Sequence, residues 1–412
     1  MYCDNRRNAL AFLRIRKVDM VKKIAILFSG DIRDRKGFMN AVLERTKRLC
    51  VLPQYSVDVF CLSTFDHLFA RKLRHSNKIE QCNTIEVEGI TINMLWIPFS
   101  ILDYVLSVKL QSGKLIEPLL LRRLLPTFRN YDLISAHSVT AGMIARMVNG
   151  RYGVPYSVTW HGSDIHTEPF LNKSYRNTVC KVVKSASANL FVSKALLSTA
   201  KQLFSVLPNA SVSYNGASKK FYTYTADEKA SVRAKYGVNA DEVVVGFVGG
   251  LVPIKNVDKL PCIFNTINSS CRKVKFWVIG DGKLRQNIEQ QLHSSYADVD
   301  CVMFGNQSPK IMPELMNCID LLVLPSQNEG LPLVIVEALS CGANVVASDV
   351  GGIKEVLGAS NVVALGDNFA ERFGARCSEI INGTEAIPGL ATDFDWATTI
   401  ERELTVYNEI MK

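Results

Sequence analysis

The chain has 412 residues, of which 48% are hydrophobic and 21% are charged. This size and composition favour two globular domains and exclude a disordered or low-complexity protein. No apolar run reaches the roughly 18–20 residues that a membrane-spanning helix needs. The eleven cysteines contain no Cys-x-x-Cys pair, which argues against a zinc site and a disulfide framework and indicates a reducing cytoplasm.

The net charge of +9 is divided unevenly along the chain. Residues 1–215 contain 30 basic and 15 acidic residues, whereas residues 216–412 contain 18 and 24. Such a division indicates two domains with different surroundings. The basic half could face nucleic acid, anionic lipid or a phosphorylated substrate, or it could simply carry an excess of solvated lysines.

The first 19 residues, MYCDNRRNALAFLRIRKVD, are basic and only intermittently apolar. They lack a small-residue cleavage site, so they do not match a signal peptide. Met20 is followed at once by VKKIAILFSG, which has the pattern of a first buried strand. We therefore predict that residues 1–19 are a basic extension, consistent with an over-long gene start.

Short apolar strands alternate with helical patterns along the rest of the chain. The strands predicted in the first half are Lys23–Phe28, Tyr55–Leu62, Leu133–His137, Tyr156–Trp160 and Asn189–Val192, with helices that include Gly37–Cys50 and Ala141–Tyr152. Those predicted in the second half are Val243–Val248, Lys275–Ile279, Cys301–Phe304, Leu321–Leu324, Asn344–Ala347 and Asn361–Ala364. This alternation predicts an α/β protein with two doubly wound, Rossmann-like domains built on parallel sheets.

The boundary between the two domains is predicted near SYNGASKKFY, residues 213–222. We expect domains at 20–214 and 215–390, followed by an amphipathic helix within 391–412. In open parallel sheets, ligands bind beyond the carboxyl ends of the strands, next to helix N-termini. Functional residues are therefore expected on the loops that lead from strands into helices.

The stretch LPSQNEGLPLVIVEALSCG, residues 324–342, is the most informative of these loops. It predicts a buried strand, a short loop, and a helix that begins near Pro332 and ends at Gly342. This helix is apolar on all sides except at Glu337, and a buried carboxylate needs hydrogen-bond donors. A ribose diol offers two donors. A loop cap or a lysine partner is the alternative.

Glu329 lies just before that helix, beside the backbone N–H groups of Gly330 and Leu331. Exposed N–H groups and the helix dipole together form a site for anions. A ligand with a sugar, a diphosphate and a ribose would meet Glu329, the helix start and Glu337 in that order.

Several other strands end in glycines. VVVGFVGGLVPIKN places Gly249 and Gly250 where a phosphate could approach the backbone, with Lys255 able to neutralise its charge. The same pattern, a strand followed by a loop with glycine, occurs in VKFWVIGDG, VTWHGSDIH and ASDVGGIKEVL. Each motif alone is weak, because glycine follows many strands only to make a turn.

Over about residues 130–365 the sequence resembles glycosyltransferase family 4. The resemblance rests on the motifs EGLPLVIVEA, VGGLVPIKN, VIGDG, DVGGIKEVL, WHGSD and YNGAS. The resemblance implies the GT-B fold, in which two Rossmann-like domains face a central cleft and a C-terminal helix returns to the first domain. It also implies transfer of a sugar from a nucleoside-diphosphate sugar with retention of configuration. Neither a metal nor a cofactor is expected.

The resemblance also implies roles for individual residues. Lys255 would stabilise the leaving diphosphate, Glu329 would meet hydroxyls of the transferred sugar, and His161 would reach the donor sugar from the first domain. Substrate-binding roles would fall to Glu337 at the ribose and to the backbone of Gly249, Gly250, Gly280, Gly330, Leu331 and, in the loop 304–307, Asn306.

One residue departs from the family pattern. The family usually has an arginine directly before the leucine of VGGLVPIKN, and this chain has Gly250 there. Half of the cationic clamp for the diphosphate is thus absent. This keeps open a non-catalytic sugar-nucleotide-binding partner in a glycan assembly complex, while a sugar-nucleotide epimerase fits less well.

Two further features concern partners. The stretch KLIEPLLLRRLLPTFRNY, 114–131, could lie on an anionic membrane or pack as an ordinary amphipathic helix, and 69–78 is a second basic stretch. We predict a cytoplasmic enzyme, at the inner face of the membrane, with a glycan or glycolipid acceptor and no nucleic acid partner. His161, Asp164 and His166 match no zinc spacing.

Overall fold

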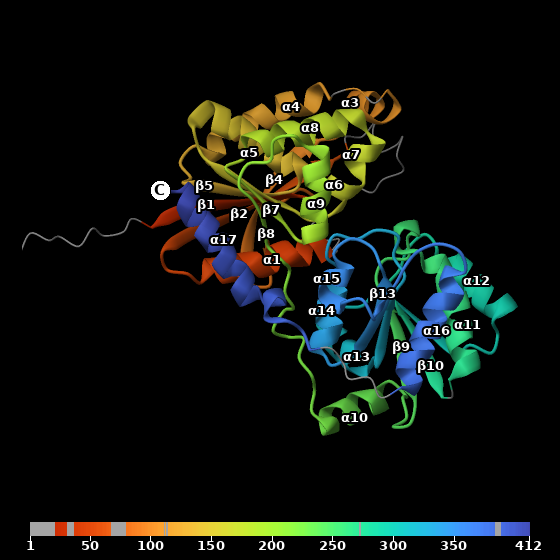
Figure 1. Ribbon diagram of the computed structural model, residues 1–412. Helices are drawn as coiled ribbons and strands as arrows, with labels where there is room; N and C mark the ends of the chain where they lie inside the picture. The colour runs from red at the N-terminus through yellow and green to blue at the C-terminus, as the bar shows by residue number, and fades with distance from the viewer. Residues whose placement is uncertain are drawn as a thin grey trace, which may run out of the picture.

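The structure, a computed structural model, describes residues 21–30, 37–66, 80–110, 112, 114–271, 273–383 and 389–412. The described chain forms two α/β units, each built around one sheet with helices on both faces (Figure 1). The predicted extension, residues 1–19, and the basic stretch 69–78 lie outside the described residues. None of the helices in the described ranges combines the length and the hydrophobicity that crossing a bilayer requires.

The N-terminal unit contains an eight-stranded sheet in the order β3-β4-β2-β1-β5-β6-β7-β8. Its strands are β1 (Lys22–Ser29), β2 (Tyr55–Phe65), β3 (Thr84–Val87), β4 (Ile90–Pro98), β5 (Leu133–His137), β6 (Tyr156–Trp160), β7 (Ala188–Phe191) and β8 (Ala210–Val212). Every residue of β5 and of β6 is buried, because helices cover both faces of the sheet.

The helices of this unit connect the parallel strands. They are α1 (Gly37–Cys50), α3 (Ile101–Tyr104), the π-helix η1 (Val105–Lys109), α4 (Ile116–Leu121), the 3₁₀ helix η2 (Arg122–Phe128), α5 (Val139–Tyr152), α6 (Ser163–His166), α7 (Glu168–Leu171), α8 (Lys173–Ser185) and α9 (Lys194–Leu203). Side chains of Ser138, Asn172 and Ser193 cap the N-termini of α5, α8 and α9, which satisfies N–H groups that the helices leave unpaired.

The edge of the N-terminal sheet differs from the purely parallel arrangement that we expected. β3 and β4 form an antiparallel hairpin, with Glu88 and Gly89 at its turn. Both turn residues have positive φ angles, 52° and 80°. A two-residue hairpin turn with two left-handed residues matches the right-handed twist of its strands. The hairpin places Glu88 next to α1, where it pairs with Lys47.

The C-terminal unit contains a six-stranded parallel sheet in the order β11-β10-β9-β12-β13-β14. Its strands are β9 (Val243–Val248), β10 (Val274–Ile279), β11 (Cys301–Gly305), β12 (Leu321–Leu324), β13 (Asn344–Ser348) and β14 (Val362–Val363). Its helices are α10 (Ala226–Lys235), α11 (Leu260–Ser270), α12 (Arg285–Ser295), α13 (Met312–Cys318), α14 (Leu333–Ser340), α15 (Ile353–Leu357) and α16 (Phe369–Asn382), with 3₁₀ turns at 253–255 and 257–259. The strand order reverses between β9 and β12, where an open sheet of this kind binds its ligand.

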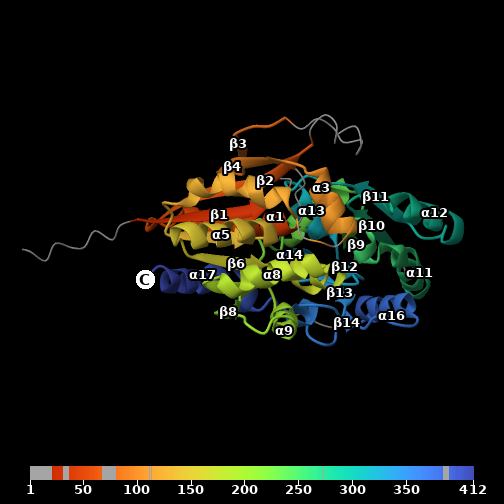
Figure 2. The same cartoon turned by 90° about the horizontal axis from the view of Figure 1, so that it is seen from above.

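The chain ends in α17 (Trp396–Ile410), which leaves the C-terminal unit and packs on the N-terminal one (Figure 2). Tyr407 of α17 is completely buried there, and Tyr55 donates a hydrogen bond to Asn408 at 2.6 Å. The predicted return of the C-terminal helix to the first domain is confirmed. The exact domain limits stay predictions.

Candidate active site between the two units

Glu337 lies on α14, the helix that the sequence singled out. The helix begins at Leu333, with Pro332 as its N-cap residue, which agrees with the predicted start near Pro332. Five of its eight residues are buried: Leu333, Ile335, Val336, Ala338 and Leu339. Their burial fixes the helix against both units and turns Glu337 toward the junction between them.

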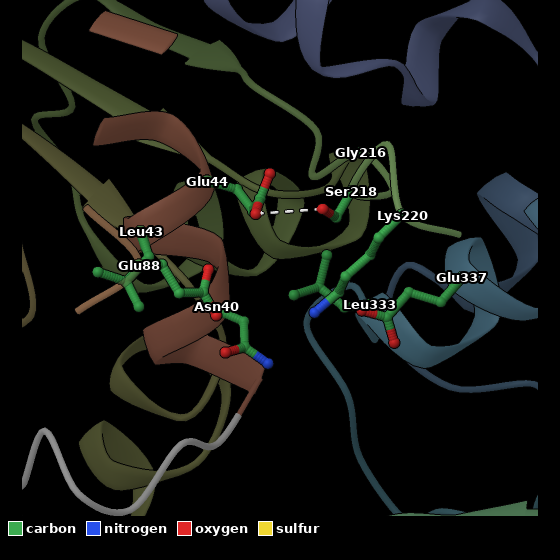
Figure 3. A pocket seen from close by; sticks show the side chains of 9 residues that line it. All are labelled: Asn40, Leu43, Glu44, Glu88, Gly216, Ser218, Lys220, Leu333 and Glu337. Carbon is green, nitrogen blue, oxygen red and sulfur yellow. Dashed lines mark hydrogen bonds between the residues drawn. The ribbon is translucent and has the colours of Figure 1, made fainter. Parts of the chain in front are cut away.

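Glu337 faces a small pocket between the units, with about 20 Å³ of free volume, room for one water molecule (Figure 3). The lining residues are Asn40, Leu43 and Glu44 of α1, Glu88 of the β3–β4 turn, Gly216, Ser218 and Lys220 of the connecting segment, and Leu333 and Glu337 of α14. Three separate stretches of chain therefore meet at this carboxylate.

The carboxylate of Glu337 makes no hydrogen bond or ion pair within the described chain. Burial raises its pKa from 4.5 to about 7, with Glu44 raising it further and the charge of Lys220 opposing the rise. Lys220 extends into the same space, but its ammonium donates to the Pro309 carbonyl at 3.4 Å. A loop cap and a lysine ion pair, the alternatives to a ligand, are thus both absent from the described residues.

Glu329 and Lys255 come together on the loops that follow β12 and β9. The ammonium of Lys255 lies 2.5 Å from Oε1 of Glu329, which also accepts a hydrogen bond from Ser326 Oγ at 2.7 Å. The two loops are neighbours because β9 and β12 pair at the point where the strand order reverses. The structure therefore places two of the three residues predicted to be catalytic in direct contact.

The glycines of the C-terminal unit allow loops to cross closely. A Cβ atom on Gly280 would lie 2.0 Å from the carbonyl oxygen of Gly249, and both residues have positive φ angles, 135° and 156°. Only glycine fits such an approach. Gly250 is different, because a Cβ there would meet only Val252, at 3.9 Å.

The backbone of Gly330 packs closely against the N-terminal unit. A Cβ atom on it would lie 2.1 Å from the carbonyl oxygen of His161 and 3.1 Å from the Cα of Gly162. Among the described residues, the N–H groups of Gly330 and Leu331 have no hydrogen-bond acceptor. They are therefore open donors at the start of α14, as an anion site requires.

His161 follows β6 and lies at this contact. Its Nε2 is 3.2 Å from Nδ1 of His137, and the ring of Phe38 meets it edge-on at 4.9 Å. Burial, with smaller contributions from His137 and Arg45, holds the pKa of His161 well below its usual value. His161 is consequently neutral at physiological pH.

The other polar residues of the WHGSD loop make local contacts. Asp164 accepts a hydrogen bond from the Gly162 N–H at 3.0 Å, and burial raises its pKa to about 6. His166 Nδ1 pairs with Thr167 Oγ1 at 2.7 Å, while its Nε2 is buried without a partner. Within the ranges that the structure covers, no three His, Cys, Asp or Glu side chains gather as they would around a metal ion.

The residues that line the pocket at Glu337 differ from the predicted ones in two respects. Asn306, in the loop after β11, is exposed and does not line the pocket at Glu337. Conversely, Lys220, Glu44 and Asn40 line that pocket, and the sequence did not point to them. The only signal for Lys220 was its place in the connecting segment YNGASKK, and a polar residue on α1 carries no signal of its own.

The sequence is similar to those of known glycosyltransferases. Residues 228–385 match the family model "Glycosyl transferases group 1". The chain is 30% identical over 228 residues to the putative teichuronic acid biosynthesis glycosyltransferase TuaC of Bacillus subtilis, which is 55% of each chain. It is 24% identical over 314 residues to D-inositol 3-phosphate glycosyltransferase of Thermobispora bispora, covering 68% of this chain and 71% of that protein. The chain thus spans about half of the length of TuaC.

Solved structures of glycosyltransferases share the fold over nearly the whole chain. HepE of Anabaena in complex with UDP superposes with a TM-score of 0.70 at 18% identity, covering 94% of this chain and all of HepE. Sucrose-phosphate synthase from Thermosynechococcus elongatus superposes with a TM-score of 0.74 at 16% identity, covering 94% of this chain and 99% of that one. The chain therefore has the GT-B fold. Within its C-terminal unit, residues 228–385 are similar to the group 1 glycosyltransferase model.

Proposed function

We propose that the protein is a glycosyltransferase of family 4, which moves a sugar from a nucleoside-diphosphate sugar to an acceptor with retention of configuration and without a metal ion. The observation that carries this proposal is Glu337, a carboxylate with a raised pKa that faces the junction between two Rossmann-like units and has no protein partner in the described chain. Unpartnered titratable groups with perturbed pKa values are typical of functional sites.

The neighbouring residues supply what glycosyl transfer needs. The leaving diphosphate carries the negative charge that develops in the transition state, so cations and N–H donors there lower the barrier. Lys255 offers a cation, and Gly330 and Leu331 offer open N–H groups. A diphosphate at this position would compete with Glu329 for Lys255. Glu329 would then be released to accept hydrogen bonds from the sugar.

Binding of nucleotide sugars to wild-type protein and to the Glu337→Ala variant tests the donor site. A thermal-shift screen with UDP, GDP and their sugar derivatives selects the donor, because a ligand that binds the folded state raises the melting temperature. UDP comes first in the panel since HepE was solved with UDP. Loss of two charge-assisted hydrogen bonds should weaken affinity about 10- to 100-fold. Unchanged affinity in the variant rules out the proposed ribose site.

Gly250 favours a second candidate, a non-catalytic sugar-nucleotide-binding partner. The position has room for a side chain but supplies no second cation for the diphosphate. Release of free sugar and nucleoside diphosphate from the bound donor separates the two candidates. A transferase slowly releases both products in the absence of acceptor, whereas a non-catalytic partner binds the donor and releases neither.

We also propose that the N-terminal unit acts at an anionic membrane surface on the cytoplasmic side, where a lipid-linked acceptor would lie. The segments 102–119 and 170–171 of this unit expose large apolar side chains: Leu102, Tyr104, Val105, Leu110, Leu115, Ile116, Leu119, Phe170 and Leu171. Asn172 donates to the Ser107 carbonyl at 2.8 Å, which joins the end of α7 to η1 and makes the two parts continuous. Exposed basic residues, including Lys109, Arg122, Arg123 and Lys173, lie on the same segments.

Apolar anchors with nearby cations are the combination that holds a protein at an anionic bilayer. Sedimentation with vesicles of phosphatidylglycerol and phosphatidylcholine tests this part. Wild-type protein should bind anionic vesicles at low salt, and the double variant Phe170→Ser, Leu171→Ser should bind much less. Phe204→Leu, a buried control, should bind as the wild type does. Equal binding of all three proteins would refute the surface.

A further inference from the structure

A line of buried polar side chains connects the C-terminal helix to His161. Tyr407 of α17 lies 2.8 Å from Ser135 of β5, hydroxyl to hydroxyl. Ser135 Oγ lies 3.2 Å from Nε2 of His137, and Nδ1 of His137 lies 3.2 Å from Nε2 of His161. Tyr407 and Ser135 are 0% exposed and His137 is 1% exposed. Three consecutive hydrogen bonds thus run from the buried interior to the partly exposed His161 at the contact between the units.

Both imidazoles in this line are neutral. Burial, helped by the charge of Arg45, lowers the pKa of His137 to about 3. The pKa of His161 is also held well below its usual value, chiefly by burial. A neutral imidazole carries one N–H and one acceptor nitrogen. Each ring can therefore donate at only one of its nitrogens.

Tyr407 sets the direction of the line. Burial raises the pKa of its phenol, so the proton stays on, and leaving a buried hydroxyl proton without an acceptor is unfavourable. Two serine hydroxyls lie beside this phenol: Ser135 Oγ is in hydrogen-bonding geometry at 2.8 Å, whereas Ser157 Oγ lies outside that geometry and has no partner in the described chain. Tyr407 therefore donates to Ser135, and the single proton of Ser135 is left for Nε2 of His137.

The donation from Tyr407 to Ser135 and from Ser135 to His137 determines where the protons of the two histidine rings lie. His137 accepts at Nε2, so its N–H is at Nδ1 and donates to Nε2 of His161. His161 accepts at Nε2, so its own N–H is at Nδ1, which makes no hydrogen bond with any described residue. We propose that this line of side chains fixes His161 as the Nδ1–H tautomer and thereby gives the site a hydrogen-bond donor. Tyr407, Ser135 and His137 are positioning residues.

The proposal has a chemical consequence for the ligand. A donor at Nδ1 requires an acceptor, such as a hydroxyl oxygen of the donor sugar or an oxygen of its phosphate. The opposite tautomer would present a lone pair and select a donor group instead. This use of the N–H rests on the proposed function, whereas the tautomer itself does not.

Nitrogen NMR of the whole protein tests the tautomer directly. In protein with ¹⁵N-labelled histidine rings, long-range ¹H–¹⁵N spectra distinguish Nδ1–H from Nε2–H rings. We expect the rings of His137 and His161, assigned by their loss in His137→Gln and His161→Gln, to be Nδ1–H at pH 7. Exposed neutral histidines ordinarily prefer Nε2–H, so the exposed His293 serves as an internal reference. An Nε2–H or doubly protonated His161 would overturn the proposal.

Two variants test what fixes the tautomer. Ser135→Ala removes the proton that His137 accepts, and we expect both rings then to populate mixed tautomers. Tyr407→Phe keeps the shape of α17 and removes the first donor, with a smaller change expected in the same direction. A pure Nδ1–H signal for His161 in both variants would show that the line does not set it. The wild-type spectrum alone decides the direction if either variant fails to fold.

A kinetic measurement then links the tautomer to the site. With the donor found in the thermal-shift screen, Ser135→Ala should lower kcat for donor hydrolysis about tenfold with little change in KM, because only the alignment of His161 changes. If the wild type does not turn over any donor, the proposed function fails while the spectra still judge the tautomer. A rise in KM alone would contradict the positioning role.

Discussion

The two sides of the junction hold their polar groups in different ways. On the N-terminal side, several polar side chains pair with one another: Arg45 donates to Glu403 and to Asn215, both at 2.8 Å, and His161 ends a line of hydrogen bonds. Nε2 of His166 is an exception there, since it is buried without a partner in the described chain. On the C-terminal side, Glu337 and the N–H groups at the start of α14 have no partner in the described chain. The paired side chains of the N-terminal side are held in place by the protein itself. The carboxylate of Glu337 and the N–H groups at the start of α14 can instead form hydrogen bonds with a ligand.

This difference has an energetic reason. A preorganised group needs no rearrangement when the reaction begins, so it belongs where geometry matters most. Unpartnered groups cost stability in the free protein, and a ligand that satisfies them gains that energy as affinity. The four predictions below test the two sides in turn, in order of decreasing effect.

Breaking the buried pair of Arg45 and Glu403 should have the largest effect. Both side chains are at most 1% exposed, so Glu403→Gln leaves a buried guanidinium without its counter-charge. We expect a loss of about 3–5 kcal/mol in unfolding free energy, measured by urea denaturation. The exposed pair of Arg402 and Asp393 is the matched control, with Arg402→Ala costing ~1 kcal/mol or less. If Glu403→Gln and Arg402→Ala lowered the unfolding free energy equally, the buried pair would contribute no more to stability than the exposed one, which would contradict this account.

Lys255→Ala tests the donor side. If Lys255 stabilises the leaving diphosphate as we propose, its loss should lower kcat for nucleotide-sugar hydrolysis by about 100- to 1,000-fold. Lys259→Ala, which removes an exposed cation one turn further along, should leave kcat within about twofold of wild type. If the two variants behave alike, the pairing of Lys255 with Glu329 is structural.

Glu337→Gln should stabilise the free protein at high pH. The folded-state pKa, about 7, lies above the ordinary value of 4.5, so the folded protein binds this proton more tightly than the unfolded chain. Stability is therefore lost as pH rises from 4.5 through 7. Because the side chain is partly exposed, we expect the variant to gain about 1–2 kcal/mol at pH 8 and little at pH 5, by thermal unfolding. A gain independent of pH would contradict this account.

Gly250→Arg should have the smallest effect, and it should be a gain. The position has open space and an ordinary backbone conformation, so stability should be unchanged. A second cation near the diphosphate should raise kcat about 3- to 10-fold. Gly280→Ala is the contrasting variant, since its Cβ would clash with Gly249, and its melting temperature should fall. A Gly250→Arg protein that melts early or gains no activity would show that the vacant position is not part of a clamp.

Much of the fold could be predicted because buried strands are apolar along their length. The structure has four strands and one helix with the same first and last residues that we predicted: Leu133–His137, Tyr156–Trp160, Val243–Val248, Leu321–Leu324 and Gly37–Cys50. The β3–β4 hairpin was missed, although TIEV-EG-ITIN alternates on either side of a two-residue turn with glycine. The expectation of parallel strands joined by helices left no place for it.

The site was predictable only where its residues follow one another in the chain. Glu329, Gly330 and Glu337 belong to one motif, and strand pairing brings Lys255 to them. Glu44 and Lys220 reach the same pocket from α1 and from the connecting segment. No spacing in the sequence relates these positions, because only the packing of one unit against the other brings them together.

Gly216 lies where two connections between the units pass each other, one leading into the C-terminal unit and one leading back from it. A Cβ atom on Gly216 would lie 2.5 Å from the backbone nitrogen of Trp396, and the rings of Tyr214 and Phe394 meet at 4.7 Å. Any swing of one lobe relative to the other would have to bend both connections at this crossing. If the two units rotate relative to one another, the packing at this crossing places the pivot close to Gly216, and a bulkier residue there would hinder that rotation.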